Sequence, residues 1–196
     1  MNTRRIVGLL TAGLILSSTA ACSSSDKPTP TASPTTKSQA APATKGKANG
    51  PLKLGTRTHW SGIDGDGSPI SGTTTALNYT QPATGVDLPD EAADFKNPTW
   101  AILEVKLCAD DTSTTILTSQ GPWALGFPDD TRLQAPGLSG SGVPKPEYPS
   151  GDGSRVAPGR CLRGKITFSL EGGTKPDMIV YAPEGRDPIE WEVPKA

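Results

Sequence analysis

Apolar and polar residues alternate along several short stretches of the chain, most clearly from Trp100 to Cys108. The apolar residues of this stretch fall on one face at a period of two: Ala101, Leu103, Val105 and Leu107. Glu104 and Lys106 point the other way. This pattern predicts a half-buried β-strand.

Similar runs recur between turns rich in Gly, Pro, Asn and Asp, and no apolar pattern of helical period extends beyond about two turns. The other runs are Leu52 to Trp60, Gly72 to Thr80, Thr115 to Leu125, Cys161 to Leu170, Asp177 to Ala182 and Ile189 to Val193. About seven short strands with turn-rich connections predict an all-β antiparallel sandwich. The best candidate for a helix is a brief turn around Pro89 to Phe95.

The first 21 residues have the composition of a secretory signal peptide: Arg4 and Arg5, then an apolar run, then small residues. The apolar run is about half the length that a bilayer-spanning helix needs.

The sequence T-A-A-C that ends at Cys22 resembles a bacterial lipobox, although Thr19 stands where leucine is usual. We therefore expect Cys22 to be acylated, for instance with palmitate. The alternative is an ordinary signal peptide followed by a free thiol, and the export route, general secretory or twin-arginine, stays open.

Residues 22–50 consist largely of Ser, Thr, Pro, Ala and Lys, a composition that predicts a disordered stalk.

Residues 51–196 have the length of one domain and carry a net charge of −6, whereas residues 23–50 carry +3. An acidic domain without a basic stripe is a poor binder of nucleic acid.

Two cysteines remain for the domain, Cys108 and Cys161, and each ends or begins a predicted strand out of phase with its apolar residues. If the two strands are antiparallel neighbours, the sulfurs meet on the outer face of the sheet. We expect a disulfide there, within a sheet or at its edge. Two free thiols or a metal pair are the alternatives, and His59 is the only histidine that could complete a zinc site.

Three segments carry a resemblance to a known family: R-V-A-P-G-R-C-L-R-G-K-I-T-F-S-L with Gly159, D-M-I-V-Y-A-P, and I-E-W-E-V from Ile189 to Val193. They resemble the C-terminal half of a family of Gram-positive cell-surface lipoproteins, which are similar to the secreted immunoprotective-antigen superfamily. Trp100 to Leu107 resembles the long central strand of that family. The resemblance implies an immunoglobulin-like domain of unknown function and transfers no active-site residue.

The long segment from Phe127 to Pro158, rich in Pro and Gly, departs from the family and is too long for a simple connection. We expect an insertion, with a recognition surface as the alternative. Binding candidates in and beside this segment are Trp123, Asp129, Asp130 and Tyr148. The tryptophans Trp60, Trp100, Trp123 and Trp191 are best assigned to the core, with exposure of Trp123 in Gly-Pro-Trp as the alternative.

Asp64, Asp66 and Ser68 have the alternating spacing that opens a calcium-binding loop. However, Pro69 and Thr75 replace the glycine and the bidentate acid of the EF-hand pattern, so a glycine-rich surface turn is the simpler interpretation. We therefore assign no metal and no cofactor.

Two acidic pairs, Asp110-Asp111 and Asp129-Asp130, flank one segment and would form an acid-base site if they converged at one end of the sandwich. Adjacent aspartates more often form turns. His59 is a candidate general base without an evident nucleophile.

These observations favour a monomeric lipoprotein on the outer face of the cell membrane. We expect a non-catalytic module that binds an envelope protein or ligand. The alternatives are an envelope hydrolase that uses the paired aspartates and a calcium-binding surface domain.

Overall fold

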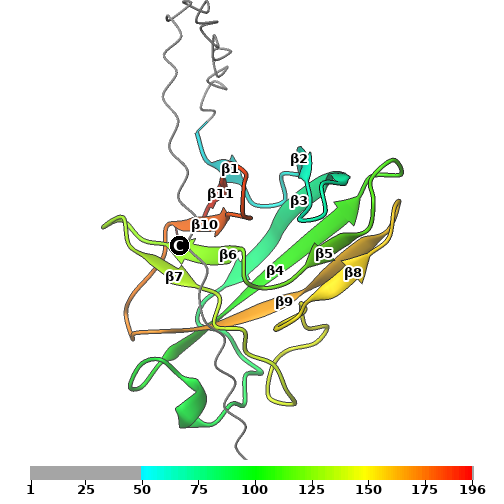
Figure 1. Ribbon diagram of the computed structural model, residues 1–196. Helices are drawn as coiled ribbons and strands as arrows, with labels where there is room; N and C mark the ends of the chain where they lie inside the picture. The colour runs from blue at the N-terminus through cyan, green and yellow to red at the C-terminus, as the bar shows by residue number, and fades with distance from the viewer. Residues whose placement is uncertain (1–49, 196) are drawn as a thin grey trace, which may run out of the picture. The chain divides into compact units, whose positions relative to one another are not determined.

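A computed structural model describes residues 50–195 (Figure 1). The predicted signal peptide at residues 1–21, the predicted acylation site Cys22 and the predicted stalk up to residue 49 lie outside the described residues. The described part consists of eleven strands and one 3-10 turn, Asp90–Ala92, which falls inside the predicted helical candidate. It contains no helix of the length and hydropathy needed to cross a membrane.

One layer of the sandwich is a sheet of four long antiparallel strands in the order β2-β3-β4-β9 (Figure 1). Its strands are β2 (Thr58–Ile63), β3 (Pro69–Thr80), β4 (Thr99–Ala109) and β9 (Cys161–Leu170). Three of them follow predicted runs closely. The fourth, β2, extends beyond the predicted run that ended at Trp60.

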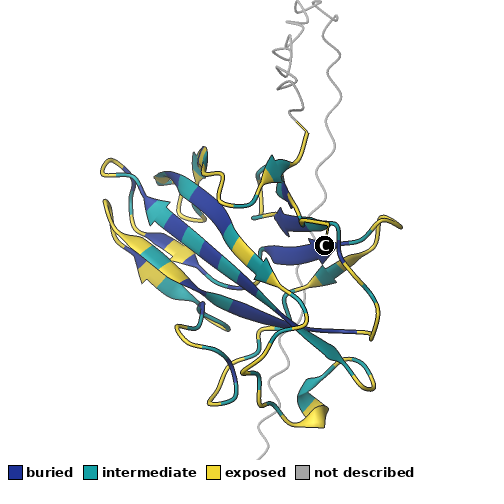
Figure 2. Cartoon of the chain, turned by 180° about the vertical axis from the view of Figure 1, so that it is seen from behind, coloured by how far each residue is buried: buried dark blue, intermediate teal, exposed yellow. Residues whose placement is uncertain are grey.

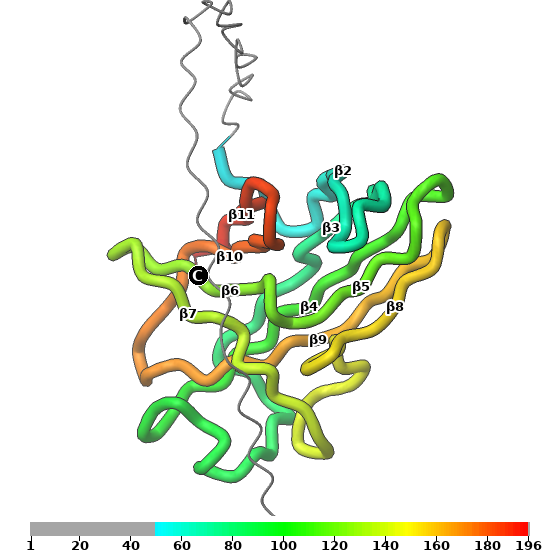
Figure 3. The backbone as a smooth tube through the Cα atoms, viewed as in Figure 1, coloured from blue at the N-terminus to red at the C-terminus, as the bar shows by residue number. Residues whose placement is uncertain are grey.

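The second layer combines a five-stranded sheet, in the order β1-β11-β10-β6-β7, with the β5-β8 ribbon (Figures 1 and 3). Its strands are β1 (Leu52–Lys53), β5 (Ile116–Thr118), β6 (Trp123–Gly126), β7 (Arg132–Gln134), β8 (Ser154–Val156), β10 (Met178–Tyr181) and β11 (Ile189–Glu192). The all-β, immunoglobulin-like sandwich is thus confirmed. One pair departs from the antiparallel expectation, because β1 runs parallel to β11.

The core lies between the two layers, and β4 provides its centre (Figure 2). The four residues predicted to face inward from β4 have no exposed surface: Ala101, Leu103, Val105 and Leu107. Trp60, Trp123 and Trp191 are buried in the same core, as predicted. Trp100 lies on the opposite face of β4 and is only half-buried.

Two predicted runs each break into two strands because a turn interrupts them. Between β1 and β2 the chain turns at Gly55, whose φ of 83° favours glycine. Between β5 and β6 it turns at Gly121-Pro122, where the amide of Trp123 donates to the carbonyl of Gln120 over 2.9 Å. Alternation alone does not reveal these interruptions, since both halves of each run keep their apolar pattern.

The segment from Phe127 to Pro158, predicted as an insertion into the family pattern, is an integral part of the fold. It supplies β7 and β8 and runs beside β9, where the Lys165 amide donates to the Pro146 carbonyl and the Tyr148 amide to the Lys165 carbonyl, both over 2.9 Å. Gly164 permits this approach, because a Cβ there would lie 2.6 Å from the Tyr148 nitrogen. The segment therefore covers the outer edge of β9 and protects it from other strands.

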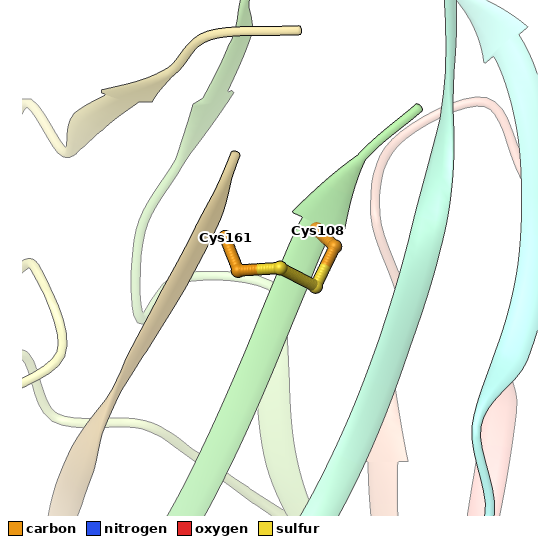
Figure 4. The surroundings of a disulfide bond; sticks show 2 residues. All are labelled: Cys108 and Cys161. Atoms are coloured by element: carbon orange, nitrogen blue, oxygen red, sulfur yellow. A yellow bond between two sulfur atoms is a disulfide. The ribbon is translucent and has the colours of Figure 1, made fainter. Parts of the chain in front are cut away.

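Cys108 and Cys161 form the predicted disulfide, on directly paired residues of β4 and β9 (Figure 4). Both residues lie on the outer face of the sheet, out of phase with the core residues. The bond therefore links neighbours within one sheet and does not cross the core, unlike the bridge of antibody domains.

Replacing both cysteines, Cys108→Ser with Cys161→Ser, should lower the free energy of unfolding by about 2–4 kcal/mol, because the bond closes a long loop in the unfolded chain. Urea unfolding followed by tryptophan fluorescence measures the change, and the reduced native protein is the matched control. The core does not contain the sulfurs, so the far-UV circular dichroism should be unchanged. Equal stability of the variant and the native protein would contradict this role.

Candidate functional site

The two acidic pairs lie at opposite ends of the molecule, so the predicted acid-base site does not form. Asp110 follows the end of β4, beside the start of β9. Asp129 lies beside Leu170, at the other end of β9. Along a strand pair of this length the separation is roughly 30 Å. The hydrolase hypothesis that depends on their convergence is therefore wrong.

Two of the predicted binding residues, Trp123 and Tyr148, are fully buried, which corrects their assignment to a recognition surface. The Trp123 ring lies 4.7 Å from the Tyr181 ring and 5.9 Å from the Trp191 ring, centroid to centroid. The Tyr148 hydroxyl is 2.7 Å from the Thr118 hydroxyl oxygen, inside the protein. Trp123 begins β6 directly after the Gly-Pro turn, and the pairing of β6 with β10 and β7 turns it inward.

The calcium candidates form a tight turn around the Asp64 carboxylate. Its Oδ1 accepts hydrogen bonds from the amides of Asp66, at 3.0 Å, and Ser68, at 2.7 Å. The carboxylate thus stabilises its own turn. No group of three or more His, Cys, Asp or Glu side chains with metal-binding geometry occurs between residues 50 and 195. Calcium binding at this turn stays a prediction.

His59 is paired with a carboxylate at the surface. Its Nε2 lies 2.8 Å from Asp110 Oδ2, and this hydrogen bond, followed by one from the Ser71 side chain, lowers the pKa of Asp110. Among the hydrogen bonds between residues 50 and 195, none joins the Ser71 hydroxyl to the His59 imidazole. The three groups therefore do not form a nucleophile, base and orienting acid in series.

The best candidate site is a cleft of about 340 Å³ at the end of the sandwich where β9 stops; we call it the end cleft. Three segments that are distant in sequence provide its apolar wall: Phe95, the β6–β7 hairpin with Phe127 and Leu133, and Leu170 at the end of β9. Three charged residues lie on its rim: Asp129, Glu171 and Lys175. A mostly apolar cleft with a few polar groups is the usual form of a small-ligand site, and this volume is at the lower end of the usual range.

The β6–β7 hairpin holds one side of the end cleft in place. The Phe127 amide donates to the Thr131 carbonyl over 3.0 Å, and the Asp130 amide donates to the Phe127 carbonyl over 3.0 Å. Asp130 has a φ of 64°, a left-handed conformation that aspartate tolerates in turns. The predicted binding residue Asp130 thus closes the turn, and its side chain faces a neighbouring hollow.

Asp129 places a fixed negative charge on the rim of the end cleft. Its Oδ1 accepts hydrogen bonds from the Thr131 hydroxyl at 2.6 Å and from the Thr131 amide at 3.1 Å. The hydroxyl, followed by the amide, holds the pKa of Asp129 below its ordinary value. The carboxylate is consequently ionised and oriented at neutral pH, which suits a cationic group on a ligand.

A second hollow of about 530 Å³ adjoins the end cleft, with Pro128 and Lys175 common to both. Tyr79 lines it, and burial raises the pKa of its phenol. The Tyr79 hydroxyl donates to Gln81 Oε1 over 2.9 Å, and Gln81 Nε2 donates to the Thr174 carbonyl over 2.7 Å. These bonds tie the end of β3 to the β9–β10 connection and give the end cleft a polar extension.

Sequence reasoning found only one rim residue of the end cleft, Asp129. The hairpin that carries the wall residues Phe127 and Leu133 could have been predicted from the sequence, because a Phe-Pro-Asp-Asp turn after an apolar run is typical of a hairpin. No local signal joins Phe95 and Leu170 to that hairpin. Their proximity depends on how the two layers pack.

Comparison with solved structures gives one match that is informative about the fold. A crystal structure of a secreted protein from Mycobacterium tuberculosis, MPT63, superposes with a TM-score of 0.53 at 16% sequence identity. The alignment covers 74% of this chain and 100% of that chain. No family model matches the chain, and no curated protein matches it. The class that these findings define is therefore an immunoglobulin-like β-sandwich of the kind found in that secreted protein.

Removing the imidazole, in His59→Ala, should raise the pKa of Asp110 toward its ordinary value of 3.8. Because the pKa of folded Asp110 is lowered, the pair stabilises the protein above the unfolded-state pKa of about 3.9. That contribution disappears as the pH falls through the lower folded-state pKa. A carbon-13 NMR titration of the side-chain carboxyl groups measures the shift. The pKa of Asp129 should not change in the same variant, since Thr131 sets it, and an unchanged pKa of Asp110 would refute the coupling.

Proposed function

We propose that this protein is a lipoprotein of the cell envelope, anchored through Cys22, which uses the end cleft to bind a ligand without catalysis. The signal peptide, the lipobox-like sequence and the Ser/Thr/Pro/Lys composition of residues 22–50 support the anchored location. The resemblance to Gram-positive surface lipoproteins and the fold that the chain has in common with the secreted protein MPT63 are consistent with it.

One observation carries the binding function: the end cleft joins an apolar wall to a fixed carboxylate. Strand ends and a hydrogen-bonded hairpin hold the wall, so little ordering is needed when a ligand binds. Leu133 and Leu170 come from strands of the two different layers, so the cleft is a product of the tertiary fold.

The chemistry of the end cleft indicates the kind of ligand. An aromatic or aliphatic group fits against Phe127 and Leu133, and a cationic group fits beside Asp129 and Glu171. Lys175, on the same rim, provides a donor for a carbonyl or carboxylate oxygen of the ligand. An envelope protein or wall component that presents an apolar side chain next to an amine has these features.

Metabolic labelling with palmitate tests the anchor. The native chain should incorporate label and sediment with membranes, and Cys22→Ala should lose the label and leave the membrane fraction, because the sulfur carries the acyl chain. Cys108→Ser provides the matched control, since its sulfur belongs to the domain. Label that persists in Cys22→Ala would show that the acyl chain is attached elsewhere, and no label on the native chain would contradict the anchor.

Site-specific photocrosslinking in cells tests the end cleft. A photoreactive residue at Thr174, on the cleft, should capture an envelope component, whereas one at Asp66, in the β2–β3 turn, should not. Adding Phe127→Ala should lower the yield by about tenfold, the usual effect of truncating an aromatic residue at a binding centre.

The control for Phe127→Ala is Leu117→Ala, which truncates a side chain on β5 that is 65% exposed. It should leave the yield unchanged. Point variants are preferable to shortening the segment from Phe127 to Pro158, because shortening would remove β7, β8 and the buried Tyr148. Equal capture at Thr174 and Asp66, or capture that is insensitive to Phe127→Ala, would contradict a ligand site in the end cleft.

A further inference from the structure

The strand β2 forms a free edge of the four-stranded sheet (Figures 1 and 3). On the other side of β3, the Ser71 and Pro69 carbonyls accept hydrogen bonds from the Asp110 and Thr114 amides, at 3.0 and 3.2 Å. Because backbone groups alternate along a strand, the intervening residues of β3 face β2. Their partners are Thr58, Trp60 and Gly62. The amides and carbonyls of His59, Ser61 and Ile63 consequently point away from the sheet.

This edge lacks the features that protect the other edges of the described sheets. The other edge of the same sheet, β9, is covered at Lys165 by the segment around Pro146 and Tyr148. The edges of the five-stranded sheet are short strands, since β1 has two residues and β7 has three. The six residues of β2 contain no proline or lysine, and their pairing with β3 has no bulge. A regular and uncovered edge of this length is a template for another strand.

An open groove of about 710 Å³ runs along this edge, and its far wall is the β10–β11 connection from Gly185 to Ile189. The near wall consists of consecutive residues, from Thr58 to Ser61. Their side chains alternate between the two faces of the sheet, so only the backbone edge between those faces can form a continuous wall. The groove thus presents unpaired peptide groups along its length.

The groove also contains a cation with an unused donor. The Arg186 guanidinium lies 3.9 Å from the centroid of the Trp60 ring, and its Nη1 is buried without a hydrogen-bond partner. The Arg186 side chain also packs against Gly62: a Cβ atom added at Gly62 would lie 3.2 Å from Arg186 Cδ. Asp187 lies on the far wall and is exposed. An acceptor oxygen entering beside Trp60 would satisfy the guanidinium.

A second copy of the chain is a poor occupant of the groove. Antiparallel pairing of two β2 strands about Ser61 would place Gly62 of each copy opposite Trp60 of the other. Since Arg186 lies against both residues, the two guanidinium groups would be brought together and repel each other. A single extended segment between β2 and the connection brings no such charge.

From these contacts we infer that the edge of β2 is a docking site for an extended peptide segment of another protein. The peptide adds to the sheet as a strand through the amides and carbonyls of His59, Ser61 and Ile63. An acidic side chain of the peptide faces Arg186. The site is separate from the end cleft, which lies at the other end of the sheet.

Hydrogen exchange measured by NMR tests this docking site, with the chain from residue 22 carrying Cys22→Ser so that it stays in solution. The probes are two synthetic peptides that alternate valine with threonine and carry glutamates or lysines at the same positions. With free peptide at about ten times Kd, exchange of the His59, Ser61 and Ile63 amides should slow by about tenfold. The amides of Thr58, Trp60 and Gly62, already paired within the sheet, are the internal control.

Three changes separate the backbone and charge contributions. The glutamate peptide should bind roughly two- to fivefold more tightly than the lysine peptide, and Arg186→Gln should abolish that difference. Ser61→Pro should abolish binding and still fold, because an edge strand tolerates proline where the amide faces outward. The glutamate peptide with N-methylated backbone amides should not bind the native protein.

Three results would overturn the inference. The first is unchanged exchange of the three amides with both peptides. The second is slow exchange without peptide that becomes slower as the protein concentration rises, which would assign the edge to a second copy. The third is slow exchange without peptide that becomes fast in a chain starting at residue 50, which would assign the edge to residues 22–49.

Discussion

The structure depends on the burial of one face of β4, the strand between β3 and β9, against the second layer. Four apolar side chains on that face, from Ala101 to Leu107, are completely removed from water, and both layers pack around them. Removing such a face from water is the main favourable contribution to folding. The opposite face carries an ion pair, in which Arg163 Nη2 lies 2.8 Å from Glu104 Oε1, and the Cys108–Cys161 disulfide. The ionic and covalent links between β4 and β9 therefore lie outside the core.

With this arrangement, the cleft and the free edge lie at an end and an edge of the sandwich. Both faces of the central strands are occupied, one by the core and the other by cross-strand pairs. At one end, the termination of β9 and the β6–β7 hairpin leave the end cleft between the layers. At one edge, β2 has no neighbour on its outer side among the described strands. The segment around Tyr148 closes the equivalent edge at β9, so the two edges of the same sheet differ in what they can accept.

Much of the fold could be predicted from local sequence. The alternation in β4, β9 and β10 predicted these strands almost to their ends, because one buried face imposes a period of two. The phase of Cys108 and Cys161 against the apolar residues also predicted on which face the disulfide lies. Short strands with irregular sequence, β7 and β8, were not predicted. They exist because neighbouring strands pair with them, and that pairing leaves no local pattern.

The sequence by itself determined the strand content, the inward face of each long strand and the cysteine pairing, because these follow from the period of the backbone and from residue chemistry. Only the tertiary structure decided that Trp123 is buried and Asp129 exposed, that Phe95 and Leu133 line one cleft, and that the acidic pairs are far apart. The physical reason is that a site between two layers depends on the relative placement of segments distant in sequence. Long-range packing sets that placement, and no single segment encodes it.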